Sequence, residues 1–274
     1  MHSTETASPF SAIIMAADRN PDDPVSRAAG VACKALTPVA GTPMVLRVLN
    51  ALQQSQQIGP RLLCGPPRPL LEQSGVLKSG VDAGDYGWTA SRESPSASAA
   101  AALEQIPEAQ PVLLTTADHA LLSRRIIDHF CGQARTADVD LMVALAPHEL
   151  VAKAYPSMQR TRLRFSDADY CSCNLFAFMT PRSRAITGVW RKVESQRKQP
   201  WRVMGILGWW PVIRYLLGRL SLQEALALLS DRFEMKIGVT IMPFAEAAVD
   251  VDSENDWRLV QQIVADKQKP RQAD

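Results

Sequence analysis

The sequence lacks the features that define several classes of protein. Its five cysteines include no CxxC pair and no histidine at ligand spacing, so we expect reduced thiols and no structural metal. No stretch reaches the roughly 18 uncharged apolar residues of a membrane-spanning helix, and the opening MHSTETASPF has neither the basic start nor the apolar run of a signal peptide. A net charge of only +2 provides no global field for nucleic acid. We therefore expect a cytoplasmic protein that does not bind nucleic acid.

The composition is that of a soluble chain with a substantial core. Hydrophobic residues make up 46% of the 274 residues and charged residues 21%, which excludes global disorder. The length allows one large α/β domain or two small ones. Cys171 and Cys173 could be half of a zinc site, but alternate positions on one strand explain their spacing better.

Short β-rich runs alternate with helical patterns in the first two-thirds of the chain. The runs span 11–17, 61–64, 111–116 and 139–146, and helical patterns occupy 42–55, 96–105 and 123–131. This rhythm is typical of parallel βαβ units. It predicts a three-layer α/β/α fold with a mainly parallel, Rossmann-like sheet covered by helices on both faces.

The last third of the chain has a different pattern of predicted strands and helices. Two further strands at 161–165 and 171–178 precede a long helical stretch at 182–233, and a strand at 236–242 and a helix at 255–265 follow it. We therefore expect a single domain over 1–266 that carries a helical insertion at 182–233. The polar residues 267–274 are expected to form a disordered tail.

The first candidate site is the segment 12–44, where an apolar strand leads into a long polar loop, a lone lysine and a helix. The loop after the first strand of an α/β sheet is a usual place for ligand binding. Arg19, Arg27 and Lys34 bring positive charge there, and backbone N–H groups can add donors for an anion. A triphosphate would suit this chemistry, although an ordinary surface loop explains Arg19 or Arg27 taken singly.

Two acidic segments complete the candidate site. Asp118 follows the apolar strand 111–116, at the strand end where a metal could be held. Asp250 and Asp252 lie two residues apart, so on a strand both would point the same way and could bind a hard cation. A helix cap at Asp118, or a solvated helix start capped by Ser253, explains each segment separately.

Together these segments resemble the MobA-like NTP transferase (nucleotidyltransferase) superfamily, which has a GT-A-like fold. The opening motif is matched by Ala16, Ala17, Arg19, Lys34, Leu36, Gly41, Pro43 and Met44. Asp118 and Asp252 match the strand-end and C-terminal acidic motifs of this superfamily. The resemblance covers roughly 12–178 and 237–265 and leaves the helical insertion uncovered.

The resemblance implies roles for these residues. The loop at Ala16, Ala17 and Asp18 would wrap the triphosphate of an NTP, and Lys34 with Arg19 would act on its phosphates. Magnesium or manganese would be held by Asp118 and Asp252, with Asp250 as support. Asp18 departs from the pattern because a loop glycine, which permits close backbone approach to phosphate, is expected there.

Two weaker matches concern the base and the acceptor. Ser94, Ser96 and Ser98 precede a helix where relatives hold the base, although helix capping by Ser96 explains the pattern equally well. Asn174 lies on the strand that carries an acceptor-binding asparagine in related enzymes, and a buried asparagine satisfied by backbone is the alternative.

The predicted function is transfer of a nucleoside monophosphate from an NTP to a small phosphorylated acceptor, with release of pyrophosphate. A GT-A-type glycosyltransferase and a degenerate, non-catalytic nucleotide-binding domain are the alternatives. The segment 198–220 is rich in tryptophan and arginine. Burial against the sheet or an oligomer contact is the favoured interpretation of this segment, ahead of an acceptor lid and of peripheral membrane contact.

Overall fold

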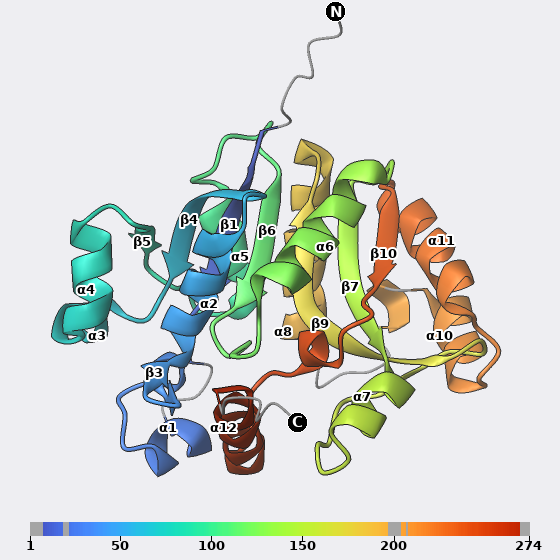
Figure 1. The fold of residues 1–274 in the computed structure, drawn as a ribbon. Coiled ribbons are helices and arrows are strands. Elements are labelled where there is room, and N and C mark those ends of the chain that lie inside the picture. Colours follow the sequence, from blue (N-terminus) through green and yellow to red (C-terminus); the bar gives the residue numbers. More distant parts are fainter. Residues whose placement is uncertain (1–7, 19–21, 197–203, 207, 269–274) are drawn as a thin grey trace, which may run out of the picture.

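The computed structural model describes residues 8–18, 22–196, 204–206 and 208–268, and its centre is a mixed sheet (Figure 1). The strands are β1 (Phe10–Met15), β4 (Ile58–Cys64), β5 (Gly87–Thr89), β6 (Val112–Thr116), β7 (Leu141–Pro147), β8 (Leu163–Arg164), β9 (Asp169–Phe178) and β10 (Ile237–Ile241). Their order is β10-β7-β9-β6-β1-β4-β5, with β8 paired to β9. A separate antiparallel pair joins β2 (Pro38–Val39) to β3 (Thr42–Pro43).

The order of the strands reverses beside β1. This strand pairs in parallel with β4 on one side and with β6 on the other, whereas β9 runs antiparallel to β6 and β7. The chain thus moves outward from β1 to β5 and then returns to β6. Open α/β sheets bind ligands at the carboxyl ends of the strands beside such a reversal. The loops after β1 and β6 therefore share the edge that faces down in Figure 1.

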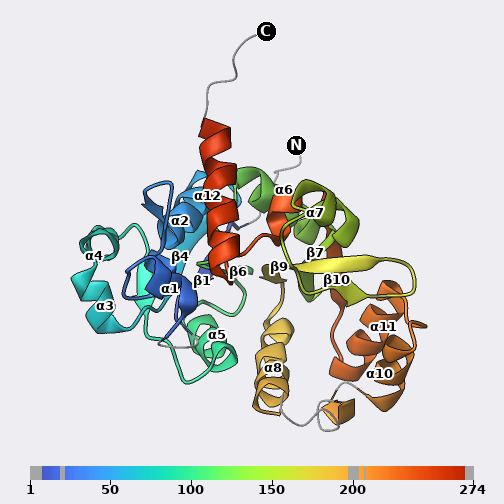
Figure 2. The ribbon, with the colours of Figure 1, turned by 90° about the horizontal axis from the view of Figure 1, so that it is seen from below.

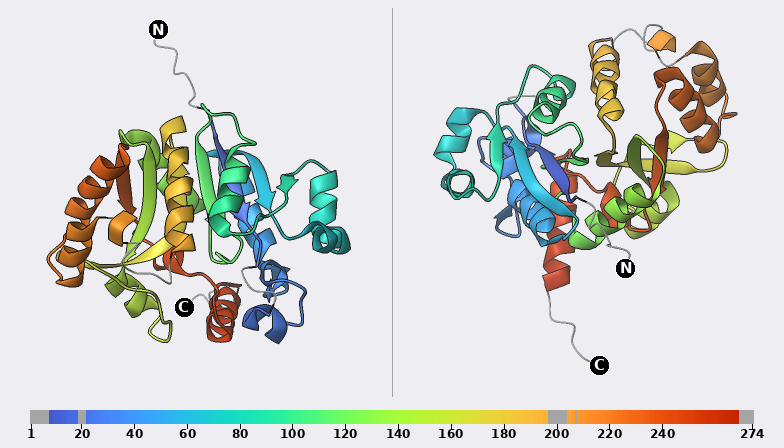
Figure 3. Two further views of the ribbon diagram at one scale, coloured as in Figure 1. Left: turned by 180° about the vertical axis from the view of Figure 1, so that it is seen from behind. Right: turned by 90° about the horizontal axis from the view of Figure 1, so that it is seen from above.

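Helices cover both faces of the sheet. One face carries α2 (Met44–Gln54) and α6 (Arg124–Thr136), and the other carries α5 (Pro95–Leu103) and α8 (Ile186–Ser195), as the left view of Figure 3 shows from behind. Ile14 of β1 is buried in one apolar cluster and its neighbour Ile13 in another. A strand that is apolar on both faces is expected when both faces are covered. The predicted three-layer α/β/α fold is confirmed.

The remaining helices surround this core. They are α1 (Pro24–Ala28), η1 (Lys34–Leu36), α3 (Arg68–Gln73), α4 (Gly75–Asp82), α7 (His148–Ala154), η2 (Pro181–Ala185), α10 (Trp209–Leu216), α11 (Leu222–Phe233), η3 (Ala245–Ala248) and α12 (Glu254–Gln268). Among the described residues, no helix combines the length and the apolarity needed to cross a bilayer.

The predicted strands are observed with boundaries shifted by a few residues. Cys171 and Cys173 are both buried at alternate positions of β9, which confirms that their spacing is that of a strand. α12 continues beyond the predicted helix end, and Lys267 donates to Glu246 at 2.8 Å. The residues 269–274 of the predicted tail lie outside the described part of the chain.

The strand predicted for Asp250 and Asp252 is wrong. β10 ends at Ile241, the turn η3 follows, and the chain then runs without a ladder partner into α12. Val249 and Val251 are fully buried in one apolar cluster. The alternation of valine and aspartate therefore comes from the packing of an irregular segment, which produces the same period of two as a strand.

The prediction that the segment 198–220 is buried against the sheet is wrong for α10, whereas the alternative of an oligomer contact stays a prediction. None of the residues of α10 is buried. α10 and α11 lie together beside β10, whereas α8 lies against α5 (Figure 2). Trp201 and Arg202 lie outside the described residues. The insertion thus contacts two separate parts of the sheet layer.

Candidate active site

Lys34 lies between two carboxylates at the edge of the sheet formed by the carboxyl ends of β1 and β6. Its Nζ donates to Asp118 Oδ2 at 2.7 Å and to Asp252 Oδ1 at 2.9 Å. These partners are 84 and 218 residues away in the sequence. The fold therefore brings together three residues that the sequence analysis identified separately. Arg19, which the resemblance assigned to the phosphates together with Lys34, lies outside the described residues.

Backbone hydrogen bonds explain this convergence. Ala117 N donates to Met15 O at 2.9 Å, so the ladder between β1 and β6 continues up to Asp118. Val251 N donates to Asp118 O at 3.1 Å and attaches the segment before α12 to the end of β6. Ser253 and Asp256 form a reciprocal cap at the start of α12. The predicted cap at Ser253 thus exists, and Asp252 beside it still faces Lys34.

The three charges are unequally exposed. The side chain of Lys34 is 14% exposed, whereas that of Asp252 is 65% exposed. Burial alone would lower the pKa of Lys34, but the carboxylates of Asp118 and Asp252 outweigh it and raise the pKa of this ammonium group. Burial opposes ionisation of Asp118, and Lys34 nevertheless lowers its pKa. Lys34 and Asp118 therefore each favour the charged form.

Asp18 contacts Lys34 from the other side. Both of its carboxylate oxygens accept the backbone N–H of Lys34, each at 3.0 Å. Burial raises the pKa of Asp18, and the hydrogen bond from Lys34 opposes this rise. The residue that replaces the expected loop glycine thus fixes the backbone at the start of η1, from which the Lys34 side chain projects.

Ala16 and Ala17 form the base of the same loop. Ala16 is buried, and its N–H donates to Cys64 O at 2.8 Å. Gly65 has a φ of +81°, and a Cβ at this position would come within 3.0 Å of Ala17 N. Only glycine allows the chain after β4 to approach the loop so closely without strain. This packing sets the path of the backbone at Asp18.

Asp250 has surroundings different from those of Asp252. Its side chain is 8% exposed, forms an ion pair with Arg160 and accepts a hydrogen bond from Asn174 Nδ2 at 2.6 Å. Asn174 has a φ of +49°, at the irregular pairing of β9 with β7. Arg160 Nη1 also lies 3.9 Å from Asp252 Oδ2. Sequence reasoning missed Arg160, because no local pattern links it to the acidic segment.

The three serines of the predicted base-binding segment have different partners. Ser94, rather than Ser96, caps α5 by accepting from Ala97 N at 3.2 Å, so the predicted cap at Ser96 is wrong. Ser98 accepts from Arg92 N at 2.8 Å and closes the loop. Ser96 is fully buried and donates to Glu194 of α8 at 2.5 Å. Glu194 is a second residue that the sequence analysis missed.

The donors at this edge suit a hard divalent cation. Asp118 Oδ1 is buried and has no hydrogen-bond partner within the described structure. Asp252 is largely exposed on the other side of Lys34. Carboxylate oxygens are the ligands that magnesium and manganese prefer. The unpartnered Asp118 oxygen and the exposed Asp252 carboxylate could therefore bind such an ion. Lys34, which now occupies the space between them, would compete with it.

Comparison with known proteins identifies the family of the chain. The model of the MobA-like NTP transferase domain matches residues 12–234. The chain belongs to the MobA-like NTP transferase domain family. The match includes the whole of the helical insertion at 182–233, which the motif resemblance had left uncovered. Membership makes this chain an NTP transferase domain in general terms.

Solved structures extend the comparison. A hypothetical transferase from Thermus thermophilus is 26% identical, with a TM-score of 0.74 over 91% of this chain and 100% of that one. The 4-diphosphocytidyl-2C-methyl-D-erythritol synthase of Anaerococcus prevotii has a TM-score of 0.57 at 12% identity, over 94% of this chain and 96% of that one. A CMP:2-keto-3-deoxy-manno-octonic acid synthetase solved with CTP gives the same TM-score and identity over 94% of this chain and 99% of that one. The last two show the shared fold. A search of curated proteins gave no match.

Proposed function

We propose that this protein is a divalent-cation-dependent nucleotidyltransferase. It transfers a nucleoside monophosphate from an NTP to a small phosphorylated acceptor and releases pyrophosphate. The observation that supports this proposal most strongly is the convergence of Asp118 and Asp252 on Lys34 Nζ, within 2.7 and 2.9 Å, at the carboxyl ends of β1 and β6. The ammonium group can neutralise phosphate charge, and the two carboxylates can hold a divalent cation, as a metal–triphosphate complex requires.

In the proposed reaction, an oxygen of the acceptor phosphate attacks the α-phosphorus of the NTP. A new bond forms between that oxygen and the α-phosphorus, and the bond to the bridging oxygen of the β-phosphate breaks. The electron pair leaves with pyrophosphate. Most of the rate enhancement in such transfers comes from positioning and from neutralising charge.

The residues of the site divide into metal ligands, a phosphate-neutralising lysine and positioning groups. Asp118 and Asp252 would hold magnesium, which when bound would neutralise phosphate charge and orient the α-phosphate. Lys34 leaves its position between the carboxylates and neutralises the phosphates. Asp18 positions Lys34 through its backbone N–H. The segment of Ser94, Ser96 and Ser98 lies beside the base, and Asn174 lies beside the acceptor.

The proposal is tested by incubating the purified protein with each of the four NTPs, magnesium and a panel of phosphorylated sugars, polyols and cofactors. Pyrophosphate release that depends on one acceptor supports nucleotidyl transfer. Transfer of a sugar from a nucleotide-sugar would instead support a glycosyltransferase. Nucleotide binding without turnover on any acceptor would support a non-catalytic domain.

A further inference from the structure

The helix α10 presents apolar side chains to solvent. The exposed residues are Trp209, Trp210, Ile213, Leu216 and Leu217, with exposed fractions of 56, 67, 39, 72 and 63%. We call these five residues the α10 face. Their separations of three and four residues place them on one side of the helix. Contiguous exposed apolar groups of this kind mark interaction sites in soluble proteins.

The other side of α10 is fixed to the sheet layer. Tyr215 accepts a hydrogen bond from Arg164 N at 3.2 Å, and its ring meets that of Phe165 edge-on with centroids 5.5 Å apart. Leu220, just after the helix, accepts from Ser166 N at 2.9 Å. Because these contacts set the rotation of the helix, turning the α10 face inward would break them. The apolar side is held outward by packing.

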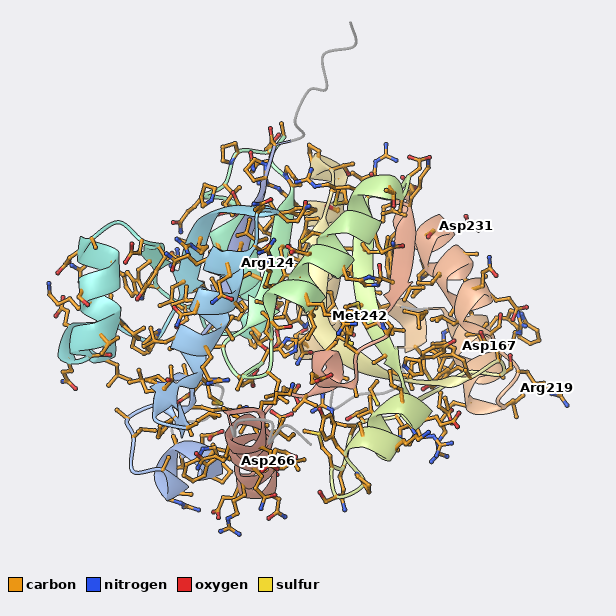
Figure 4. The ribbon with its side chains drawn as sticks, viewed as in Figure 1. Arg124, Asp167, Arg219, Asp231, Met242 and Asp266 are labelled. Atoms are coloured by element: carbon orange, nitrogen blue, oxygen red, sulfur yellow. The ribbon has the colours of Figure 1, made fainter. Side chains whose placement is uncertain are left out.

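Positive charge is concentrated in the same part of the sequence. Residues 182–220 contain nine Lys and Arg residues and one Glu, a net charge of +8, so the rest of the chain carries −6 against a total of +2. The segment also contains four of the six tryptophans. Figure 4 shows Arg219 at the outer side of this region, pointing away from the sheet. Of the charged residues that the structure places beside the α10 face, Arg214 pairs with Glu224 at 2.7 Å and Arg219 is exposed, so an anionic partner would meet the guanidinium of Arg219.

We propose that the α10 face docks on an anionic phospholipid bilayer. Tryptophan side chains favour the boundary between headgroups and acyl chains, leucine and isoleucine side chains gain from burial in it, and basic residues attract anionic headgroups. A symmetric contact with a second copy would bring two strongly basic segments together. Single-stranded nucleic acid stacks on aromatic rings but offers little to aliphatic side chains. The proposal stands independently of nucleotidyl transfer.

The test uses the full chain and vesicles. At low salt the protein should sediment with vesicles that contain about 30% phosphatidylserine and stay in solution with pure phosphatidylcholine, and added salt should weaken the binding. The double substitution Trp209→Ala, Trp210→Ala should lower vesicle binding roughly tenfold or more, because two interfacial anchors are removed. Arg219→Glu should lower it about fivefold or more.

Matched controls change comparable residues elsewhere on the surface. Val76→Ala removes apolar surface from a residue of α4 that is 55% exposed, and Lys78→Glu reverses an exposed charge on the same helix. Neither change should alter vesicle binding. If the double tryptophan variant loses its circular dichroism melting transition, the pair Leu216→Ser, Leu217→Ser repeats the test on the same face.

Three results would overturn the proposal. The first is that the wild-type protein fails to sediment with anionic vesicles even at low salt. The second is that the control variants weaken binding as much as the variants of the α10 face do. The third is a dimer in solution that the double tryptophan substitution dissociates while vesicle binding is absent, which would make a second copy the partner. None of these measurements depends on catalytic activity.

Discussion

The edge of the sheet at Lys34 and the helical insertion differ in opposite ways from the usual arrangement, in which charged side chains face water and apolar side chains are buried. At the edge, the charged groups of Lys34, Asp118 and Asp250 are largely removed from water. In the insertion, the apolar side chains of Trp210 and Leu216 are left in water. A buried charge is tolerated when it is paired with an opposite charge. A large apolar patch on the surface of a protein usually marks a site that a binding partner covers. In this molecule the edge pairs its charges internally, whereas the α10 face has no cover among the described residues.

A large effect that separates the two regions is expected at Lys34. Lys34→Ala should lower turnover by roughly two to four orders of magnitude, because charge that develops on the phosphates loses its partner. Steady-state kinetics at saturating NTP measures this loss. Trp210→Ala is the matched control in the insertion and should leave turnover on a soluble acceptor unchanged. An unaltered rate for Lys34→Ala would exclude this lysine from catalysis.

The same variant tests the metal site without activity. Removal of the ammonium group leaves no cation between Asp118 and Asp252, so magnesium should raise the melting temperature of Lys34→Ala more than that of the wild type. Calcium or manganese offers a second probe of the same oxygens. Equal shifts in the two proteins would mean that these carboxylates hold no metal.

The two acidic residues should contribute to activity as one unit. Asp118→Ala and Asp252→Ala should each abolish metal-dependent turnover, and the double variant should be hardly slower than either single variant, because effects of groups that act together are not additive. Rates measured against magnesium concentration check this expectation. If Asp250→Ala removes the magnesium dependence while Asp252→Ala retains it, Asp250 rather than Asp252 is the metal ligand.

Stability should distinguish Asp250 from Asp252. Asp250→Ala leaves the buried guanidinium of Arg160 without its ion pair and should cost about 3–5 kcal/mol of unfolding free energy. Asp252 is mostly exposed, so Asp252→Ala should change stability by less than about 1 kcal/mol. Urea unfolding monitored by circular dichroism measures both values. Equal losses would show that Arg160 depends on neither carboxylate in particular.

The contact between the insertion and α5 should affect nucleotide binding moderately. Glu194→Ala removes the acceptor of the Ser96 hydroxyl at the start of α5, so KM for the NTP should rise roughly three- to tenfold with little change in kcat. Glu104→Ala, at the opposite end of α5, is the control. A fall in kcat without a change in KM would contradict a positioning role.

The smallest effect is expected for the stability of the α10 face. Leu216→Ser should alter the free energy of unfolding by no more than about 0.5 kcal/mol, because the side chain is already in water. Phe130→Ala in the buried face of α6 should cost about 3–5 kcal/mol. A large loss for Leu216→Ser in thermal melts would show that this face is covered by the protein itself.

The sequence analysis succeeded where local pattern and tertiary position coincide. Apolar runs at β1 and β6 predicted buried parallel strands, and the resemblance to the MobA-like superfamily assigned Lys34, Asp118 and Asp252 to one site. Arg160 and Glu194 were missed because their partners are distant in sequence; Glu194 and Ser96 are 98 residues apart. Nothing local to Arg160 indicates that it faces a carboxylate.

The orientation of α10 could not be predicted for a related reason. Its sequence shows an amphipathic helix, but the helix period does not say whether the apolar side faces the sheet or the solvent. Tyr215 and its contacts with 164–166 decide that orientation. Likewise, Asp18 was recognised only as a departure from the glycine pattern, since its contact with the Lys34 backbone depends on how a long loop returns to the sheet.

The central claim is that the α-phosphate of an NTP passes to the acceptor at the site of Lys34, Asp118 and Asp252. It is tested most directly with NTP labelled at the α- or the γ-phosphate, the wild-type protein, magnesium and the acceptor found in the screen. The account predicts that the α-label appears in the acceptor, that the γ-label leaves in pyrophosphate, and that Asp118→Ala abolishes both. Transfer of the γ-label to the acceptor, or transfer that persists in Asp118→Ala without magnesium, would contradict it.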